Sequence, residues 1–356
     1  EVRYNLTTMI GVVHAQRARA RALVAASLAV LPAAAARAAE CDPPSGVSTC
    51  FDADSLWHSA GASRFAGLSS PAVPNPGSLA FAALLSYVDR PVLLSAPSPD
   101  PEGRDVNVVR DRVDLSLAYS YGLGAGLELS VATPVVLHQT GSGAEGITSQ
   151  RAPPLTSVAV RDPRIGGAIR LLRTEGEHGW DAKLKLELGL PLGDDQLYAG
   201  AGAFTFAPGF ASGLRWGPLH GAVELGARLR RAVPFATAKI GSQAFAGVGV
   251  GVDVIGERLS LELEASALPS LVSQPGRTRS ASRVSGGRLV PAEWLASLRS
   301  APVADAGVSF SLGGGTGLPL SSETRETASA SSTERFAGVT TPRFRLFFGL
   351  RYQPEL

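Results

Sequence analysis

Apolar and polar residues alternate one by one along many stretches of this chain. Every second residue from Val113 to Tyr121 is apolar or aromatic, and the same holds from Trp180 to Leu190. A period of two places successive side chains on opposite faces, so the pattern predicts β-strands with one apolar and one polar face. Many are close to the ~9–11 residues that a tilted transmembrane strand needs. The predicted strands are 79–87, 113–121, 127–137, 165–171, 180–190, 204–216, 219–229, 245–254, 259–267, 294–300, 306–312 and 344–352.

The connections between these segments alternate between long and short. Asp89–Arg112 and His138–Arg164 are long, whereas Gly122–Gly126 and Gly217–Pro218 are short. Outer-membrane barrels have short periplasmic turns and longer external loops. We therefore predict an all-β fold, an antiparallel transmembrane outer-membrane β-barrel of about 12 strands. Residues 78–353 form this barrel, and an even number of strands places both ends of the chain in the periplasm.

Large aromatic residues lie at the ends of the predicted strands. Transmembrane barrels carry aromatic girdles at both membrane interfaces. We expect outer-membrane lipid around such a barrel. The predicted girdle residues are Tyr121, Trp180, Trp216 and Tyr352 at the short-turn ends, with Tyr87 and Trp294 at the long-loop ends.

Charged residues fall on the polar face of the predicted strands. A charge facing lipid near the membrane centre costs ~2–4 kcal/mol for Arg or Lys, so these side chains must point inward. They could line a hydrated path for small polar solutes, or pair across the lumen and seal it. The candidates are Asp114, Glu128, Arg170, Lys183, Lys185, Glu187, Glu224, Arg228, Glu262, Glu264, Arg299, Arg345 and Arg351.

Residues 1–38 read as upstream residues followed by a signal peptide. Arg17, Arg19 and Arg21 precede the apolar run Ala22–Leu31, and Ala36-Arg37-Ala38 fits a cleavage site. This order of basic, apolar and small residues is that of a secretory signal. It predicts export and, with the barrel, a Gram-negative outer-membrane location.

Residues 39–77 precede the first predicted strand. Cys41 and Cys50 lie close together, and such a pair in an exported protein predicts a disulfide. The segment could be a periplasmic tether, which we favour, or a plug folded into the lumen. As a plug it would be anchored by Phe51, Leu56, Trp57 and Phe65.

Composition narrows the function further. The 33 Lys and Arg nearly balance the 31 Asp and Glu, which argues against nucleic acid as a partner. The 40 Gly and 25 Pro disfavour a helical bundle. Gly141–Gly146 fits G-x-G-x-x-G, but no helix pattern follows, so it does not indicate a nucleotide site. His58, His138, His178 and His220 are scattered, and we expect no enzyme activity, cofactor or metal site.

Four stretches resemble the N-terminal barrel region of large precursors of the outer-membrane protein A superfamily. They are Phe51–Trp57 with Ser63–Phe65, Val223–Leu229, Val290–Trp294 and Thr341–Arg345. In such precursors thrombospondin-type-3-like repeats and a peptidoglycan-binding domain follow the barrel; neither occurs in these 356 residues. The resemblance is a diffuse barrel pattern over about residues 50–352. Gly349–Tyr352 also resembles the terminal-strand signal that barrel-assembly machinery reads.

Together these observations predict a narrow porin-like channel for small polar solutes. Twelve strands lie between the ~8 that side chains fill and the ~16–18 that leave an open channel, so a sealed structural or surface-interaction barrel is the first alternative. A transporter of hydrophobic solutes is the second. The sequence does not indicate an oligomeric state.

Overall fold

The computed structural model has no helix, among the residues it describes, that is long and apolar enough to cross a membrane. The described residues are 41, 46–59, 63–96, 104–143, 155, 158–174, 178–236, 238–255, 258–274, 277–279, 282–302, 307–327, 330–334 and 339–353. The predicted signal peptide lies outside them.

The main sheet has 13 strands, and 12 of them close into a ring. The remaining strand, β4 (Ala159–Val160), pairs only with β3. The ring closes because β1 pairs with both β2 and β19, all antiparallel. The barrel strands are β1 (Leu79–Ala96), β2 (Arg104–Gly124), β3 (Leu127–Thr140), β5 (Arg164–Arg173), β6 (His178–Gly189), β7 (Thr205–Trp216), β8 (Leu219–Arg228), β11 (Gln243–Asp253), β12 (Leu259–Ala267), β15 (Ala292–Ser300), β16 (Val308–Gly317) and β19 (Phe344–Tyr352).

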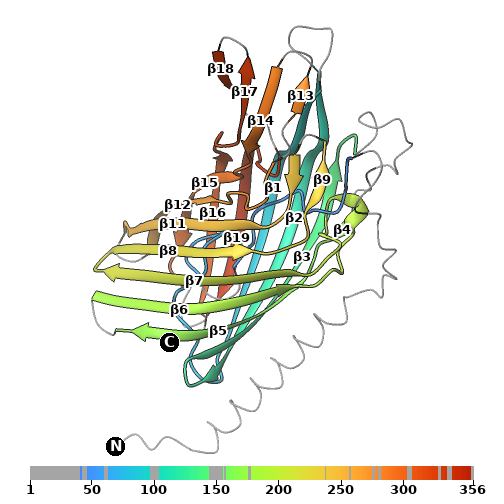
Figure 1. Ribbon diagram of the computed structural model, residues 1–356. Helices are drawn as coiled ribbons and strands as arrows, with labels where there is room; N and C mark the ends of the chain where they lie inside the picture. Colours follow the sequence, from blue (N-terminus) through green and yellow to red (C-terminus); the bar gives the residue numbers. More distant parts are fainter. Residues whose placement is uncertain are drawn as a thin grey trace, which may run out of the picture. The chain divides into compact units, whose positions relative to one another are not determined.

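Long and short connections alternate as predicted except between β1 and β2, where the strands extend and leave only residues 97–103 between them. At one end, which we call the turn end, β7 and β8 are joined by only Gly217 and Pro218. The opposite end, the loop end, carries every remaining element and a separate sheet in the order β13-β14-β17-β18 (Figure 1). These elements are η1 (Asp195–Leu197), β9 (Val233–Phe235), β10 (Ala238–Ile240), β13 (Arg277–Arg279), β14 (Ser282–Arg288), β17 (Ser322–Thr327) and β18 (Ala330–Glu334).

The strand interiors follow the predicted two-residue period. On β6, Leu184 and Leu186 are 46% and 43% exposed. Lys183, whose side chain points to the opposite face of the strand, is 3% exposed. A barrel that turns leucines outward and charges inward presents an apolar surface suited to lipid. The interior of the barrel is therefore polar and its outer surface apolar, which is the reverse of a water-soluble domain.

Three predicted strands are too short at the loop end, and one of them, β2, begins at Arg104 rather than at residue 113. Strand β1 continues past residue 87 to Ala96, where it pairs with Arg104 of β2. Strand β16 continues past residue 312 to Gly317. Above the rim a strand no longer has one face toward lipid, so apolar alternation fades although the backbone pairing continues.

Residues 46–59 and 63–77 lie inside the ring, and the preference for a periplasmic tether was wrong. Val47 forms a β-bridge with Phe235 at the loop end, and the Gly77 N–H donates to the Gly122 carbonyl at the turn end. The described residues between them contact inward-facing side chains of the barrel. We call residues 46–77 the plug.

Candidate functional site: the plugged lumen

The half of the plug nearer the loop end is held by ion pairs. Asp54 is fully enclosed, and its carboxylate lies 2.5 and 3.1 Å from the two Nη atoms of Arg345 on β19. Arg161, just after β4, approaches the same carboxylate at 3.4 Å. Burial alone would raise the pKa of Asp54, but the charges of Arg345 and Arg161 overcome it and lower the pKa. Asp54 is therefore a charged anchor.

Asp52 adds a second carboxylate beside Asp54. It lies 2.7 Å from Arg161 and 3.1 Å from Arg112 of β2. Arg112 also pairs with Asp114 at 2.9 Å, and its side chain is completely buried. A buried guanidinium charge is costly unless a carboxylate compensates it. The plug supplies two of the carboxylates that the arginines require.

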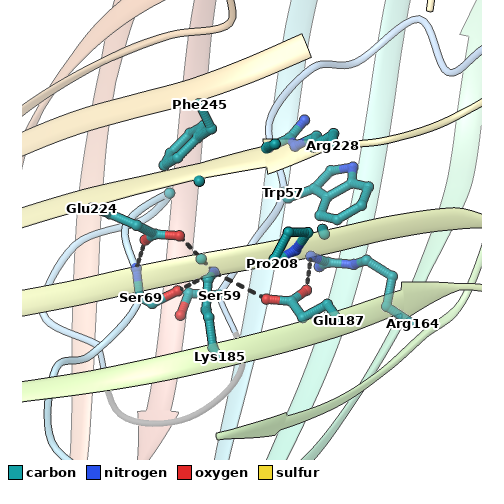
Figure 2. A pocket seen from close by; sticks show the side chains of 15 residues that line it. Trp57, Ser59, Ser69, Arg164, Lys185, Glu187, Pro208, Glu224, Arg228 and Phe245 are labelled. Atoms are coloured by element: carbon teal, nitrogen blue, oxygen red, sulfur yellow. Dashed lines mark hydrogen bonds and ion pairs between the residues drawn. The ribbon is translucent and has the colours of Figure 1, made fainter. Parts of the chain in front are cut away.

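Trp57 marks the middle of the lumen. Its indole ring lies between two guanidinium groups, 4.6 Å from Arg164 of β5 and 4.2 Å from Arg228 of β8 (Figure 2). Arg164 pairs with Glu187 at 2.9 Å, while Arg228 donates to the Ser55 carbonyl at 2.7 Å. Cation–π contacts of this kind strengthen away from water. Trp57 therefore helps two wall arginines to remain inside the barrel.

Two small cavities flank Trp57, each with room of about 30 Å³. One is bordered by Lys185, Glu187 and Glu224, where Lys185 lies 2.5 Å from Glu224 and 3.1 Å from Glu187 (Figure 2). A volume of this size accommodates about one water molecule. Among the described residues, these two cavities beside Trp57 are therefore too small for a solute.

The half of the plug nearer the turn end is held mainly by its backbone. Glu264 of β12 accepts from the N–H groups of Ala66 at 2.9 Å and Gly67 at 3.1 Å. Glu224 accepts from Ser69 N–H at 2.6 Å. Two arginines complete the set: Arg351 donates to the Phe65 carbonyl and Arg170 to the Val73 carbonyl. The wall carboxylates thus satisfy backbone groups that have no strand partner.

Glycines on β11 make room for this part of the plug. A Cβ at Gly247 would come within 2.3 Å of Leu68, and one at Gly249 within 2.7 Å of the Phe65 ring. Both glycines are buried on the inner face, and Val248 and Val250 point outward. A larger side chain here would push the plug away from the wall.

His58 is a buried titratable group of the plug. Its Nδ1 lies 2.9 Å from the Ala66 carbonyl, so Nδ1 carries the proton. Burial and the charges of Arg351 and Arg164 lower the pKa of His58 to about 3. This histidine is neutral at neutral pH, and charging it would place a cation beside two arginines.

The loop end is closed by an apolar cluster. Phe51 contacts Tyr198 and Phe235 with ring centroids 5.3 and 4.8 Å apart. Cys41 and Cys50 form a disulfide at its edge. Among the described residues, one group of potential metal ligands lies close together, namely Cys41, Cys50 and Asp195. Its two sulfur atoms are already bonded to each other. The plug therefore begins beneath the long loops.

The predicted lumen residues all face inward. Among the thirteen, Asp114, Lys183 and Arg345 are fully buried and contribute to ion pairs. Arg299 also points inward, although its predicted strand was short. Arg345 does so too, although its strand carries Phe347 on the polar face. Phe347 joins them and packs in a cluster with Leu56 of the plug.

The predicted girdle residues all face outward by strand alternation. Trp180, Trp216 and Trp294 are the most exposed, at 49%, 64% and 37%. Trp180 Nε1 donates to Ser212 at 2.7 Å and Trp294 Nε1 to Thr316 at 2.9 Å. Their position at the membrane interfaces stays a prediction.

Sequence reasoning missed Arg112, Arg161, Arg164 and Glu293, together with the two plug aspartates. Arg112 and Arg164 flank the predicted strands 113–121 and 165–171 by one residue. The inward glycines of β11 were a usable signal, because glycine on a packed face indicates close approach of another backbone or side chain.

No family model and no curated protein matches this chain. Among solved structures it is similar to an outer membrane channel from Pseudomonas putida F1, with a TM-score of 0.51 and 12% identity over 80% of this chain and 98% of that one. This chain folds as an outer-membrane β-barrel. Weaker similarities are to OpdL of Pseudomonas aeruginosa (TM-score 0.31, 9% identity, 78% and 98% covered) and the toluene transporter TbuX of Ralstonia pickettii (0.33, 10%, 79% and 90%). TM-scores at that level add nothing further about this chain.

Proposed function

We propose that this protein is a channel for small polar solutes in the Gram-negative outer membrane and that the plug closes it in this conformation. The observation that carries the proposal is the way the plug is held. Its contacts with the wall are mostly ion pairs and hydrogen bonds, and separate apolar clusters take the place of one continuous core. Polar contacts can be exchanged for water, so a hydrated path can form where the plug now lies.

The wall would suit such a path. Charged groups from most of the barrel strands face the lumen, as Lys183 of β6 and Glu128 of β3 illustrate at 2.7 Å. A wall of this kind favours hydrophilic solutes, and it does not favour the alternative of a hydrophobic-solute transporter.

A sealed structural barrel is the second candidate. The cavities around Trp57, with room for about one water molecule each, favour it. In that case the working surface would be the loop end, with the sheet β13-β14-β17-β18.

Single-channel conductance in a planar bilayer tests the two candidates. We expect the intact protein to be closed most of the time and a variant lacking residues 46–70 to conduct steadily. The slower migration of heated protein on a gel would verify that the shortened barrel has folded. A folded, shortened barrel without conductance would contradict the channel and support the sealed barrel.

A cysteine staple offers a second test that keeps the full plug. A Cβ at Gly213 would lie 3.4 Å from the Cβ of Pro71, close to the ~3.5–4.5 Å between disulfide-linked Cβ atoms. We expect Pro71→Cys/Gly213→Cys to lower the open fraction. The two single-cysteine variants are the matched controls.

We further propose that residues 1–38 direct export, that lipid surrounds the barrel, and that the assembly machinery reads its last strand. The finer kinship with barrel precursors of the outer-membrane protein A superfamily and the absence of enzyme activity are proposals as well. Their support is the exported-barrel pattern and the fold shared with a channel.

A further inference from the structure

We infer that Arg112, Arg161 and Arg345 form a binding site for small dicarboxylate anions, which Asp52 and Asp54 of the plug now occupy in place of a solute. The inference rests on the proposed channel function and names its solute class. It follows from the orientation of the three guanidinium groups.

The wall carboxylates satisfy only one side of these guanidinium groups. Asp114 binds Arg112 through Nε at 2.9 Å, and Glu293 lies 3.3 Å from Arg345 Nε. Arg112 Nη1 donates to the Tyr198 carbonyl, and its Nη2 lies 3.1 Å from Asp52 of the plug. Both Nη atoms of Arg345 bind Asp54, in the two-pronged geometry that guanidinium groups prefer for carboxylates.

Three separate elements bring these groups together. Arg112 comes from β2, Arg161 from the segment after β4, and Arg345 from β19. Arg161 lies between the two plug aspartates, 2.7 Å from Asp52 and 3.4 Å from Asp54. Because one guanidinium group contacts both carboxylates, the two lie side by side although nine atoms separate them along the plug. A four-carbon dicarboxylic acid, with two methylene carbons between its carboxyl groups, can present a similar pair.

Charge balance shows what the wall lacks when the plug leaves. Three arginines then face two wall carboxylates, Asp114 and Glu293, which leaves one positive charge in excess. The side chains of Arg112 and Arg345 are fully buried, and an uncompensated charge at such depth is costly. An incoming dicarboxylate can replace the plug carboxylates on the same donors, so binding it and releasing this half of the plug are linked.

Thiol labelling in detergent tests the exchange without any conductance measurement. The described residues contain no free cysteine, so Ser55→Cys introduces a single thiol into the plug beside Asp54. We expect sodium succinate to raise its rate of alkylation by a maleimide at least about tenfold. Sodium chloride at equal ionic strength and uncharged succinamide should change the rate less than about twofold. Ser142→Cys, on an exposed loop, controls for reagent reactivity.

Two variants locate the effect. Asp54→Asn removes the internal competitor, so half-maximal labelling should need at least about tenfold less succinate. Arg345→Gln should abolish the response, whereas Arg351→Gln, on the same strand but bonded to the Phe65 carbonyl, should retain it. If Arg345→Gln does not fold, the shift in Asp54→Asn decides.

Equal responses to succinate and chloride would mean charge screening alone and would overturn the inference, as would no response to either. The channel proposal is tested separately. Labelling that responds to succinate in a barrel that never conducts would leave the anion site standing and remove the channel. A barrel that conducts but whose labelling does not respond to succinate would leave the channel standing and remove the anion site.

Discussion

The two halves of the plug are held by different chemistry. Near the loop end, side chains of the plug do the binding: Asp52 and Asp54 reach wall arginines. Near the turn end, the wall does the binding: Glu264 and Glu224 accept from plug backbone N–H groups. The first half depends mainly on the acidic side chains that the plug carries. The second depends mainly on where its backbone runs, although Arg64 of the plug also pairs with Asp253 of β11 at 3.1 Å. The proposed exchange with a solute therefore concerns the loop-end half.

The largest expected effect is that of Asp54→Asn. It keeps the shape of the side chain but leaves Arg345 without its two-pronged partner, and breaking a buried pair typically costs ~3–5 kcal/mol. We expect hydrogen-exchange protection of plug residues 51–57 to fall at least about a hundredfold. Protection of residues 66–69 should change far less; a uniform loss over the whole plug would show that its halves are not independent.

Acidification should release the plug through His58. Its pKa is about 3 in the fold and about 6.5 when exposed, so the neutral form is the one that the fold stabilises. The contribution of His58 to the stability of the plug is complete above pH ~6.5 and is lost as the pH falls toward 3. The hydrogen-exchange protection factors should fall by up to about tenfold per pH unit. Protection factors of Ala66 and Gly67 at pH 6.5 and 4.5 measure this.

The control for the pH effect is His58→Gln, whose amide can still donate to the Ala66 carbonyl. Its protection factors should be nearly constant between pH 6.5 and 4.5. If they fall as steeply as in the natural protein, other groups of the lumen are responsible. Asp54, whose pKa is lowered, contributes its own loss only below pH ~4.

A smaller effect is expected for Glu264→Gln. The amide oxygen still accepts from plug N–H groups, but the bond loses its charge, which is worth ~1–2 kcal/mol. Hydrogen exchange at Ala66 and Gly67 should speed up about tenfold, with residues 51–57 unaffected. Exchange that speeds up at residues 51–57 instead would contradict a turn-end role for Glu264.

The smallest effect is expected for Ser70→Ala. Among the described residues, its hydroxyl hydrogen-bonds within the plug, with the Ala72 backbone at 3.2 and 3.3 Å. Plug protection should change no more than about twofold. A change as large as that of Glu264→Gln would mean that plug-internal turns, rather than wall contacts, hold the turn-end half.

The sequence was most informative where each residue's environment repeats. The predicted strands 127–137, 180–190, 259–267 and 344–352 match β3, β6, β12 and β19 to within three residues at either end. Lipid on one side and charge on the other impose a period of two that needs no knowledge of the partner strand. The inward direction of Lys183 and Glu262 followed from the same rule.

The sequence by itself therefore determined the barrel, the number of its strands and the side of the wall that carries charge. Only the tertiary structure decided where residues 46–77 lie and which arginines they bind. That segment has no repeating pattern, and its anchors are remote: Asp54 meets a residue 291 positions away in the chain, and Ala66 one 198 positions away. Water, an ion or the chain itself could have filled a lumen with an excess of arginine. The plug fills it because the fold brings its carboxylates against these arginines.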